Sequence, residues 1–161
     1  MNNQNNQKTE LVAVCHNIRS RHNVGSIFRT ADGAGVSKIF LCGITPSPPH
    51  GNIEKVSLGA ENYIAWEKGK NTWQVLDKLR KEGFEILALE QAEDAVDYRK
   101  YKPRKGKKIA LVLGNEIDGL PETVLKRANE ILHIPMSGRK ESLNVSVAFG
   151  VAVYKLIDLI V

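Results

Sequence analysis

The chain has 161 residues, of which 42% are hydrophobic and 25% charged, which is enough apolar content for the core of one domain. Its formal net charge is +5, and lysines and arginines are concentrated in segments 19–29, 100–108 and 139–140. Such clusters favour a polyanionic partner, although the charge alone fits a soluble basic surface equally well. No apolar run approaches the roughly 18 residues of a membrane span, and the polar start lacks the apolar core of a signal peptide, so we expect a soluble, cytoplasmic protein with no membrane partner.

Cysteines and histidines do not form a pattern typical of a disulfide framework or a metal site. Cys15 and Cys42 lie in apolar runs, where small buried side chains are expected. The four histidines are His16, His22, His50 and His133. Their spacing does not place two of them on one helix face beside a carboxylate, so we expect no structural or catalytic metal.

Strand and helix patterns alternate along the chain. Residues 1–8 are rich in Asn and Gln and are expected to form a disordered tail. The hydrophobic patterns predict strands at 11–15, 38–42, 84–89, 109–114 and 131–134, and helices at 23–34, 72–82, about 121–128 and from 143 to the end. Asn23 is the expected N-cap of the first helix, and segments 43–52 and 99–107 are expected to be loops.

This alternation predicts one α/β domain over residues 9–161, with a mainly parallel sheet and helices on both faces. Ligands of such sheets bind beyond the carboxyl ends of the strands. The last helix is apolar on nearly every side, so we expect it to be buried on more than one face, partly against a second subunit.

Common nucleotide-binding and hydrolase motifs are not present. The Gly33–Lys38 segment lacks the third glycine of GxGxxG, and the Gly-Lys pairs at 69 and 106 lack the upstream glycine of a P-loop. No serine stands in a GxSxG motif. A classical Rossmann cofactor site, a P-loop and a hydrolase nucleophile elbow are therefore excluded.

Three polar clusters, at 23–32, 113–121 and 134–146, each follow a predicted strand or begin a helix. They carry Asn23 and Arg29, then Gly114, Asn115 and Glu116, then Ser142 and Asn144. Taken singly, each cluster also fits turn glycines and helix caps, which have no catalytic role. The functional interpretation therefore depends on the presence of all three clusters and on their order along the chain.

Together and in this order, the three clusters resemble the signature motifs of the SpoU/TrmH-like RNA 2′-O-methyltransferases of the SPOUT superfamily. The resemblance covers the chain from about Leu11 to Leu159. It implies a C-terminal deep trefoil knot, S-adenosylmethionine bound in the knotted region, and RNA as the substrate. Knots are rare in proteins, so this expectation depends on the resemblance alone.

The family pattern also implies which residues bind the cofactor, largely through backbone atoms. These are Gly114, Ile134 and Leu143, with Leu89, Asn115 and Met136 as neighbours. An adenine ring needs flat apolar walls and backbone hydrogen bonds, and leucine and isoleucine at strand ends supply such walls. Glycine would let the ligand approach the backbone closely.

For catalysis, the resemblance points to Arg29, with four further residues positioning the ribose, the arginine or the cofactor. These are Asn23, Glu116, Ser142 and Asn144. A ribose 2′-oxygen would attack the methyl group of a sulfonium in line. Arginine is a poor proton acceptor, so we expect its guanidinium to hold an RNA phosphate and stabilise the developing alkoxide, while a phosphate oxygen or water takes the proton.

The family is dimeric, usually through the last helix. The apolar face of that helix, formed by Val147, Val151, Tyr154 and Leu156, is consistent with a homodimer. In relatives an arginine of the partner often completes the site, and Arg19 or Arg21 is the candidate here.

Two other functions stay open, namely a base-directed SPOUT RNA methyltransferase and an RNA-binding module without activity. The pairs Asn23/Arg29 and Ser142/Asn144 favour the ribose-directed group. A tRNA loop and a ribosomal RNA loop both fit as the substrate. We expect recognition by segments 43–56 and 99–108 and by the entrance at Arg19 and Arg21, since proteins usually read unpaired RNA bases.

Overall fold

The computed structural model describes residues 9–103 and 108–161, so the predicted tail at 1–8 lies outside the described residues. In the described part, seven strands form one sheet in the order β3-β2-β1-β6-β4-β7-β5, and every pair of neighbouring strands is parallel. The strands are β1 Glu10–His16, β2 Lys38–Cys42, β3 Ala65–Gly69, β4 Glu85–Leu89, β5 Val96–Asp97, β6 Lys108–Leu113 and β7 Glu130–His133. The predicted α/β class with a parallel sheet is confirmed.

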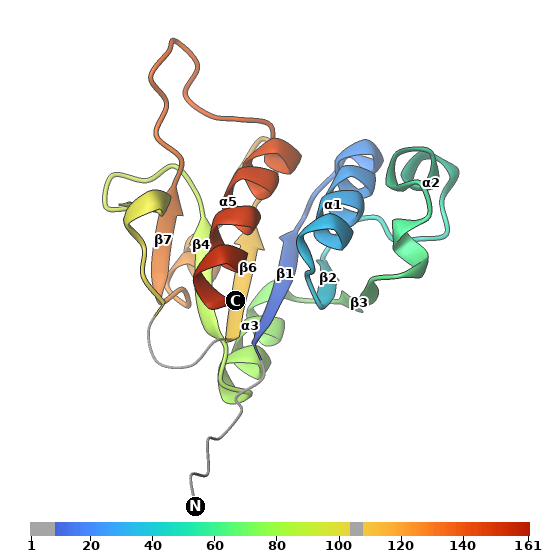
Figure 1. The fold of residues 1–161 in the computed structure, drawn as a ribbon, viewed down its shortest axis with the longest axis horizontal. Helices are drawn as coiled ribbons and strands as arrows, with labels where there is room; N and C mark the ends of the chain where they lie inside the picture. Colours follow the sequence, from blue (N-terminus) through green and yellow to red (C-terminus); the bar gives the residue numbers. More distant parts are fainter. Residues whose placement is uncertain (1–8, 104–107) are drawn as a thin grey trace, which may run out of the picture.

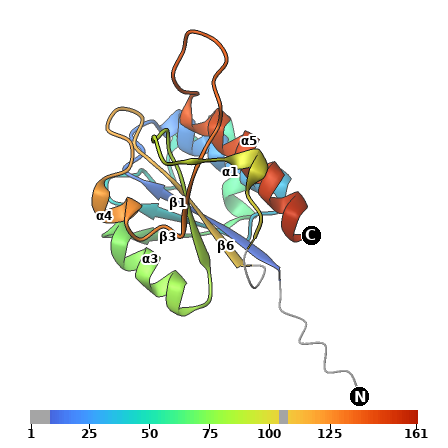
Figure 2. The same ribbon diagram turned by 90° about the vertical axis from the view of Figure 1, so that its left-hand side faces the viewer.

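Helices cover both faces of the sheet. They are α1 Arg21–Ala34, α2 Gly51–Ser57, α3 Thr72–Lys81, α4 Glu122–Leu125 and α5 Val145–Ile160, with short 3₁₀ turns at Ala60–Asn62 and Tyr98–Lys100. Figure 2 shows α1 and α5 on one face and α3 and α4 on the other. Among the described residues, no helix combines the length and the apolar character needed to cross a membrane.

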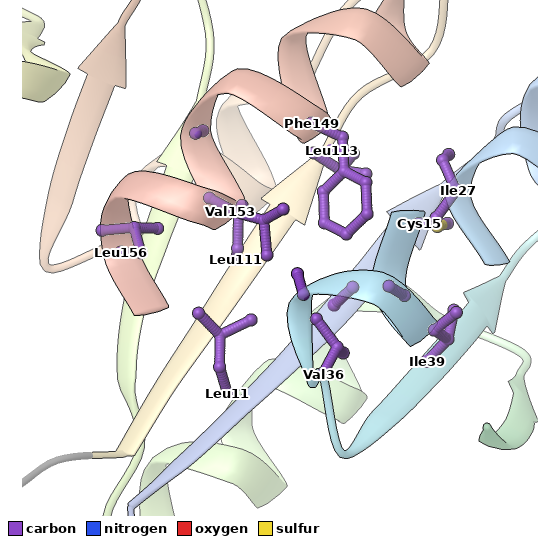
Figure 3. Packing of buried hydrophobic residues seen from close by; sticks show 14 of the residues in the cluster. Leu11, Cys15, Ile27, Val36, Ile39, Leu111, Leu113, Phe149, Val153 and Leu156 are labelled. Carbon is purple, nitrogen blue, oxygen red and sulfur yellow. The ribbon is translucent and has the colours of Figure 1, made fainter. Parts of the chain in front are cut away.

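Alternate residues of each central strand point into opposite cores. In β1, Leu11, Ala13 and Cys15 pack in the cluster under α1 and α5, which Figure 3 shows in part. Val12 and Val14 pack instead in the cluster that includes residues of α3 and α4. Both faces of the strand are buried, which explains why its sequence is an uninterrupted apolar run.

The carboxyl ends of the parallel strands lie at one edge of the sheet. In Figure 1 the arrows of β1, β6 and β7 point toward this edge, and the loop between β7 and α5 projects beyond it. The loops that follow β4, β6 and β7 therefore meet at the edge where parallel sheets bind ligands.

Several predicted element boundaries were wrong. The N-cap of α1 is Ser20, whose Oγ accepts a hydrogen bond from the Asn23 backbone N at 3.1 Å, so Asn23 lies inside the first turn. Helix α4 ends at Leu125 rather than near residue 128. The predicted loop 43–52 ends at the start of α2, and α2, β3 and β5 were not predicted.

The expected burial of the last helix is confirmed for one side of α5. Phe149, Val153 and Leu156 are buried in the monomer core, so Leu156 does not belong to an exposed interface face as predicted. Val147, Val151 and Tyr154 are 51%, 37% and 51% exposed. These three residues, spaced four and three apart, form an exposed apolar stripe along α5.

Candidate functional site

A cavity of about 350 Å³ lies at the carboxyl ends of β4, β6 and β7, bounded by the start of α5. Eight of the eleven predicted site residues line it: Leu89, Gly114, Asn115, Glu116, Ile134, Ser142, Leu143 and Asn144. Asn23, Arg29 and Met136 are not among the lining residues. The fold thus gathers residues from the second and third sequence clusters around one space.

Apolar side chains from three strand ends form the inner wall of the cavity. Leu89, Leu113 and Ile134 follow or end β4, β6 and β7, and Leu143 precedes α5. The Gln91 side chain donates from Nε2 to the Ile134 carbonyl oxygen at 2.8 Å. This bond ties the loop after β4 to the end of β7.

The loop after β6, residues 114–120, is held by the side chain of Asn115. Its Oδ1 accepts hydrogen bonds from the backbone N of Ile117 and Asp118 at 2.8 and 2.9 Å. Its Nδ2 donates to the Asn17 carbonyl oxygen at 2.7 Å, which links this loop to the end of β1. Asn115 is 8% exposed, so this amide shapes the loop from within.

Gly114 is required by the loop itself. A Cβ at this position would lie 2.8 Å from the Gly119 carbonyl carbon and 3.0 Å from the Leu120 N. The sequence interpretation assigned this glycine to close approach of a ligand. The structure shows that the loop folds back on the glycine, so any larger residue must displace the cavity wall.

One hydrogen-bond network joins all three sequence clusters at the rim of the cavity. Glu116 accepts from the backbone N of Arg19 and Ser20 at 3.1 and 3.2 Å and from Asn23 Nδ2 at 3.1 Å. Asn23 Oδ1 in turn accepts from Asn144 Nδ2 at 3.1 Å. The start of α1, the loop after β6 and the start of α5 are thereby held together.

Asn144 is also the N-cap of α5. Its Oδ1 accepts from the backbone N of Ser146 and Val147 at 2.9 and 3.4 Å, while its Nδ2 is directed to Asn23. A side chain that caps a helix with one atom and binds a second helix with the other has a fixed orientation. Capping and site formation are therefore functions of the same residue.

Glu116 is held in its ionised form by this network. Partial burial raises its pKa, but hydrogen bonds from Arg19 N, Asn23 Nδ2, Ser20 N and its own backbone N together lower the pKa below the ordinary value of 4.5. A carboxylate that accepts hydrogen bonds from several N–H groups stays ionised at neutral pH. Glu116 is therefore suited to holding other groups in position and is a poor proton acceptor.

Arg29 lies apart from this network, on the exposed side of α1. In the described part of the chain, no hydrogen bond or ion pair engages its guanidinium. Its neighbour Thr30 packs toward α5, where its Cγ2 would be 3.6 Å from a Cβ on Gly150. The structure therefore leaves Arg29 free for a partner outside the described chain.

Sequence reasoning missed three residues that build the site, namely Ser20, Glu90 and Gln91. Ser20 stands three residues before Asn23, which is the usual spacing between an N-cap residue and the backbone N–H from which its side chain accepts a hydrogen bond. Glu90 and Gln91 directly follow a predicted buried strand, where ligands of parallel sheets bind. Both signals were present in the sequence.

Within residues 9–103 and 108–161, no three His, Cys, Asp or Glu side chains are grouped so that they could hold a metal ion. An all-parallel sheet with a cavity at its carboxyl edge and a polar network at the rim defines an α/β protein with a small-molecule site. The chain belongs to the SpoU rRNA Methylase family, whose model matches residues 10–154. The resemblance inferred from the three motifs is thereby confirmed.

Individual relatives agree with this assignment. The chain is 30% identical over 149 residues to a tRNA (guanosine(18)-2′-O)-methyltransferase of Aquifex aeolicus, covering 92% of this chain and 69% of the relative. It is 29% identical over 152 residues to a 23S rRNA (guanosine-2′-O-)-methyltransferase of Vibrio parahaemolyticus, covering 93% and 60%. The AdoMet-bound rRNA methyltransferase from Sinorhizobium meliloti superposes with a TM-score of 0.89 at 30% identity, covering 96% of this chain and 58% of that one.

Proposed function

We propose that the chain transfers a methyl group from S-adenosylmethionine to a ribose 2′-hydroxyl of a tRNA or ribosomal RNA. The observation that carries this proposal is the network from Glu116 through Asn23 to Asn144, which unites the three motif segments beside the cavity. The printed names of the two relatives, a tRNA and a 23S rRNA 2′-O-methyltransferase, support the reaction and the substrate class. The chain spans 69% and 60% of the length of these two relatives.

The cavity fits S-adenosylmethionine in size and in chemistry. Its volume of about 350 Å³ lies within the range of about 300–1,000 Å³ that is usual for small-molecule sites. Leu89, Ile134 and Leu143 would flank the adenine, while Gly114 and Asn115 would offer backbone groups. Met136, partly buried in the loop after β7, would be a neighbour. When bound, this cofactor supplies an electrophilic methyl group on a sulfonium.

The residues at the rim would orient the ribose. Glu116 fixes the start of α1 and Asn23 fixes Asn144, so both asparagines have defined positions next to the cavity. Ser142 is exposed and lines the same cavity, where its hydroxyl can bond to the ribose. Such positioning lowers the barrier of a displacement because the attacking oxygen must lie in line with the methyl group.

Arg29 would act on the RNA. Its guanidinium would bind a phosphate next to the target ribose and stabilise the 2′-oxygen as negative charge develops there. The ribose proton would pass to a phosphate oxygen or to water, because arginine does not accept protons at neutral pH. The free guanidinium of Arg29 supports this role.

We propose that the chain acts as a homodimer through the exposed stripe of Val147, Val151 and Tyr154. Exposed apolar side chains at this spacing form a continuous surface on one side of a helix, and a second copy would cover it. Arg19 or Arg21, both exposed at the entrance of α1, would complete the site of the partner.

We also propose that the C-terminal part forms a deep trefoil knot and that the protein works in the cytoplasm, where tRNA and ribosomal RNA are substrates. Strand order supports the knot, since β4 lies between β6 and β7 while α5 packs against both β4 and β6.

Tritiated methyl transfer to bulk RNA tests the activity. We expect label in RNA with the wild-type protein, and a rate at least tenfold lower with Asn144→Ala, which removes a contact to Asn23. Digestion to nucleosides should place the label on ribose. Label on a base would instead support a base-directed methyltransferase, and RNA binding without any transfer would support a module that only binds RNA.

A further inference from the structure

The cavity is acidic although the protein is basic. Glu90, Glu116 and Glu141 line it, together with His133. Among the described residues that line the cavity there is no lysine or arginine, whereas the chain as a whole has a net charge of +5. Arg139 and Lys140 precede Glu141 in the loop after β7, but both are exposed and do not line the cavity.

Glu90, which directly follows β4 and lines the cavity, is fixed in position by two hydrogen bonds and by close packing. Its Oε2 accepts a hydrogen bond from the Leu120 N at 2.8 Å, and its Oε1 accepts one from the Gln91 N at 2.9 Å. The carboxylate also fills the place where a Cβ of Gly119 would lie. Both donors are backbone N–H groups that carry no net charge, so the negative charge of Glu90 is not neutralised by a neighbouring cation.

Glu141 differs from Glu90 in its contacts. It is exposed at the mouth of the cavity, and in the described part of the chain no hydrogen bond or ion pair engages it. Its charge can therefore be removed without loss of a structural contact. Substitution of Glu90 changes both the charge of the cavity and a contact that holds the loop after β6, whereas substitution of Glu141 changes the charge alone. Comparison of the two variants therefore separates the effect of charge on ligand binding from the effect of loop position.

We propose that Glu90, assisted by Glu141, makes the cavity select the positively charged methyl donor over its neutral demethylated product. This inference rests on the proposed methyltransferase function. In the transfer, the S–CH₃ bond breaks and its electron pair stays on sulfur, while the methyl carbon bonds to the ribose oxygen and the ribose proton leaves to phosphate or water. The sulfonium thereby becomes a thioether, and the attraction to the carboxylates is lost.

The expected effect follows from Coulomb attraction between the carboxylates and the sulfonium. For a partly exposed carboxylate the effective dielectric constant lies between about 20 and 80, so one charge about 10 Å away changes a dissociation constant by about twofold to fifteenfold. The same attraction weakens with salt, because the Debye length falls from about 10 Å at 0.1 M to about 3 Å at 1 M. The product, with a neutral sulfur, should show a smaller dependence on salt.

Isothermal titration calorimetry of the full chain tests this selectivity with three ligands. These are S-adenosylmethionine, its demethylated product S-adenosylhomocysteine, and sinefungin, an unreactive analogue with an ammonium group in place of the sulfonium methyl. Wild-type protein should bind both cationic ligands more tightly than the product. Glu90→Gln and Glu141→Gln should each reduce the ratio of product to donor dissociation constants by about threefold or more.

Glu93→Gln is the matched control, since Glu93 is exposed in the same segment as Glu90 and does not line the cavity. It removes the same charge from the chain and should leave the ratio unchanged. If Glu90→Gln weakens all three ligands equally and Glu141→Gln leaves the ratio unchanged, Glu90 only positions the loop and the selectivity proposal is wrong. If wild-type protein binds none of the three ligands, the methyltransferase function itself fails.

Discussion

The Glu116 carboxylate accepts hydrogen bonds from three N–H groups of other residues, namely two backbone groups and one side-chain amide, all of them uncharged. In Glu116→Gln the amide replaces one acceptor by a donor, so at least one of the three bonds is lost. We expect a methyl-transfer rate at least tenfold lower and a free energy of unfolding about 1 kcal/mol lower at pH 7, since the side chain is partly exposed. Single-turnover kinetics and urea denaturation measure the two effects.

The stability difference between wild type and Glu116→Gln should depend on pH. The pKa of Glu116 is lower in the folded protein than its ordinary value of 4.5, so its ionised form stabilises the fold above that pH. The difference should be constant from about pH 6 to 8 and should shrink as the pH falls through the folded pKa. A difference that grows on acidification would contradict the assigned hydrogen bonds.

A substitution at Arg29 tests whether the proposed role needs the planar shape of the guanidinium or only its positive charge. Arg29→Lys keeps a positive charge but cannot form the planar fork that binds two phosphate oxygens. We expect the single-turnover rate to fall at least tenfold while the melting temperature changes by less than about 2 °C, because the guanidinium engages no other described group. Full activity of this variant would show that the fork is not needed.

Individual site residues were predicted from the motifs, but their contacts were not. Asn23 and Asn144 are 121 residues apart in sequence, and the resemblance indicated only that both belong near the ribose. Spacing gives no information on a hydrogen bond between the starts of two helices that tertiary structure brings together. The predicted cap at Asn23 was wrong because Ser20 offers the same chemistry one turn earlier.

At the scale of the element, the loop after β6 depends on Gly114. Gly114→Ala would place a methyl group 2.8–3.0 Å from backbone atoms of Gly119 and Leu120. Because backbone cannot rotate away, we expect the loop to move and the affinity for S-adenosylmethionine to fall at least tenfold. Gly138→Ala is the control, since its Cβ would meet no atom within 4 Å. Equal affinity of both variants in calorimetry would refute this role of Gly114.

Strands and helices with a strong apolar pattern were predicted well, and the weakly patterned ones were missed. Strand β3 lies at the sheet edge and has the sequence AWEKG, with no buried residue. Helix α2 buries only Ile53 and Ser57. Edge strands and short helices are formed by contacts with their neighbours, so their own residues carry little periodic signal.

At the scale of the whole molecule, the stripe on α5 predicts the oligomeric state. Tyr154→Glu places a charge in the proposed interface, where it would be buried without a partner. We expect a shift from dimer to monomer in light scattering after size exclusion. Tyr63→Glu is the control, because Tyr63 is 79% exposed outside the stripe. A wild-type protein that is monomeric at all concentrations would contradict the dimer.

Fold class followed from the sequence because parallel strands buried on both faces are continuous apolar runs, as in Ile109–Leu113. Strand order did not follow, since β6 pairs with β1 across almost 100 residues. Periodicity describes which side of an element is buried and contains no information on which strands pair. Only the family resemblance could supply that arrangement before the structure.

Methylation of ribose in defined RNA tests the central claim most directly. Total RNA from cells that lack the gene would be incubated with purified protein and deuterated S-adenosylmethionine, then mapped for 2′-O-methyl groups by mass spectrometry. We predict deuterated methyl on the ribose of a defined tRNA or ribosomal RNA nucleotide, formed at least tenfold more slowly with Asn144→Ala. Absence of any ribose methylation with wild-type protein, in RNA that still contains the unmodified target, would contradict the proposed function.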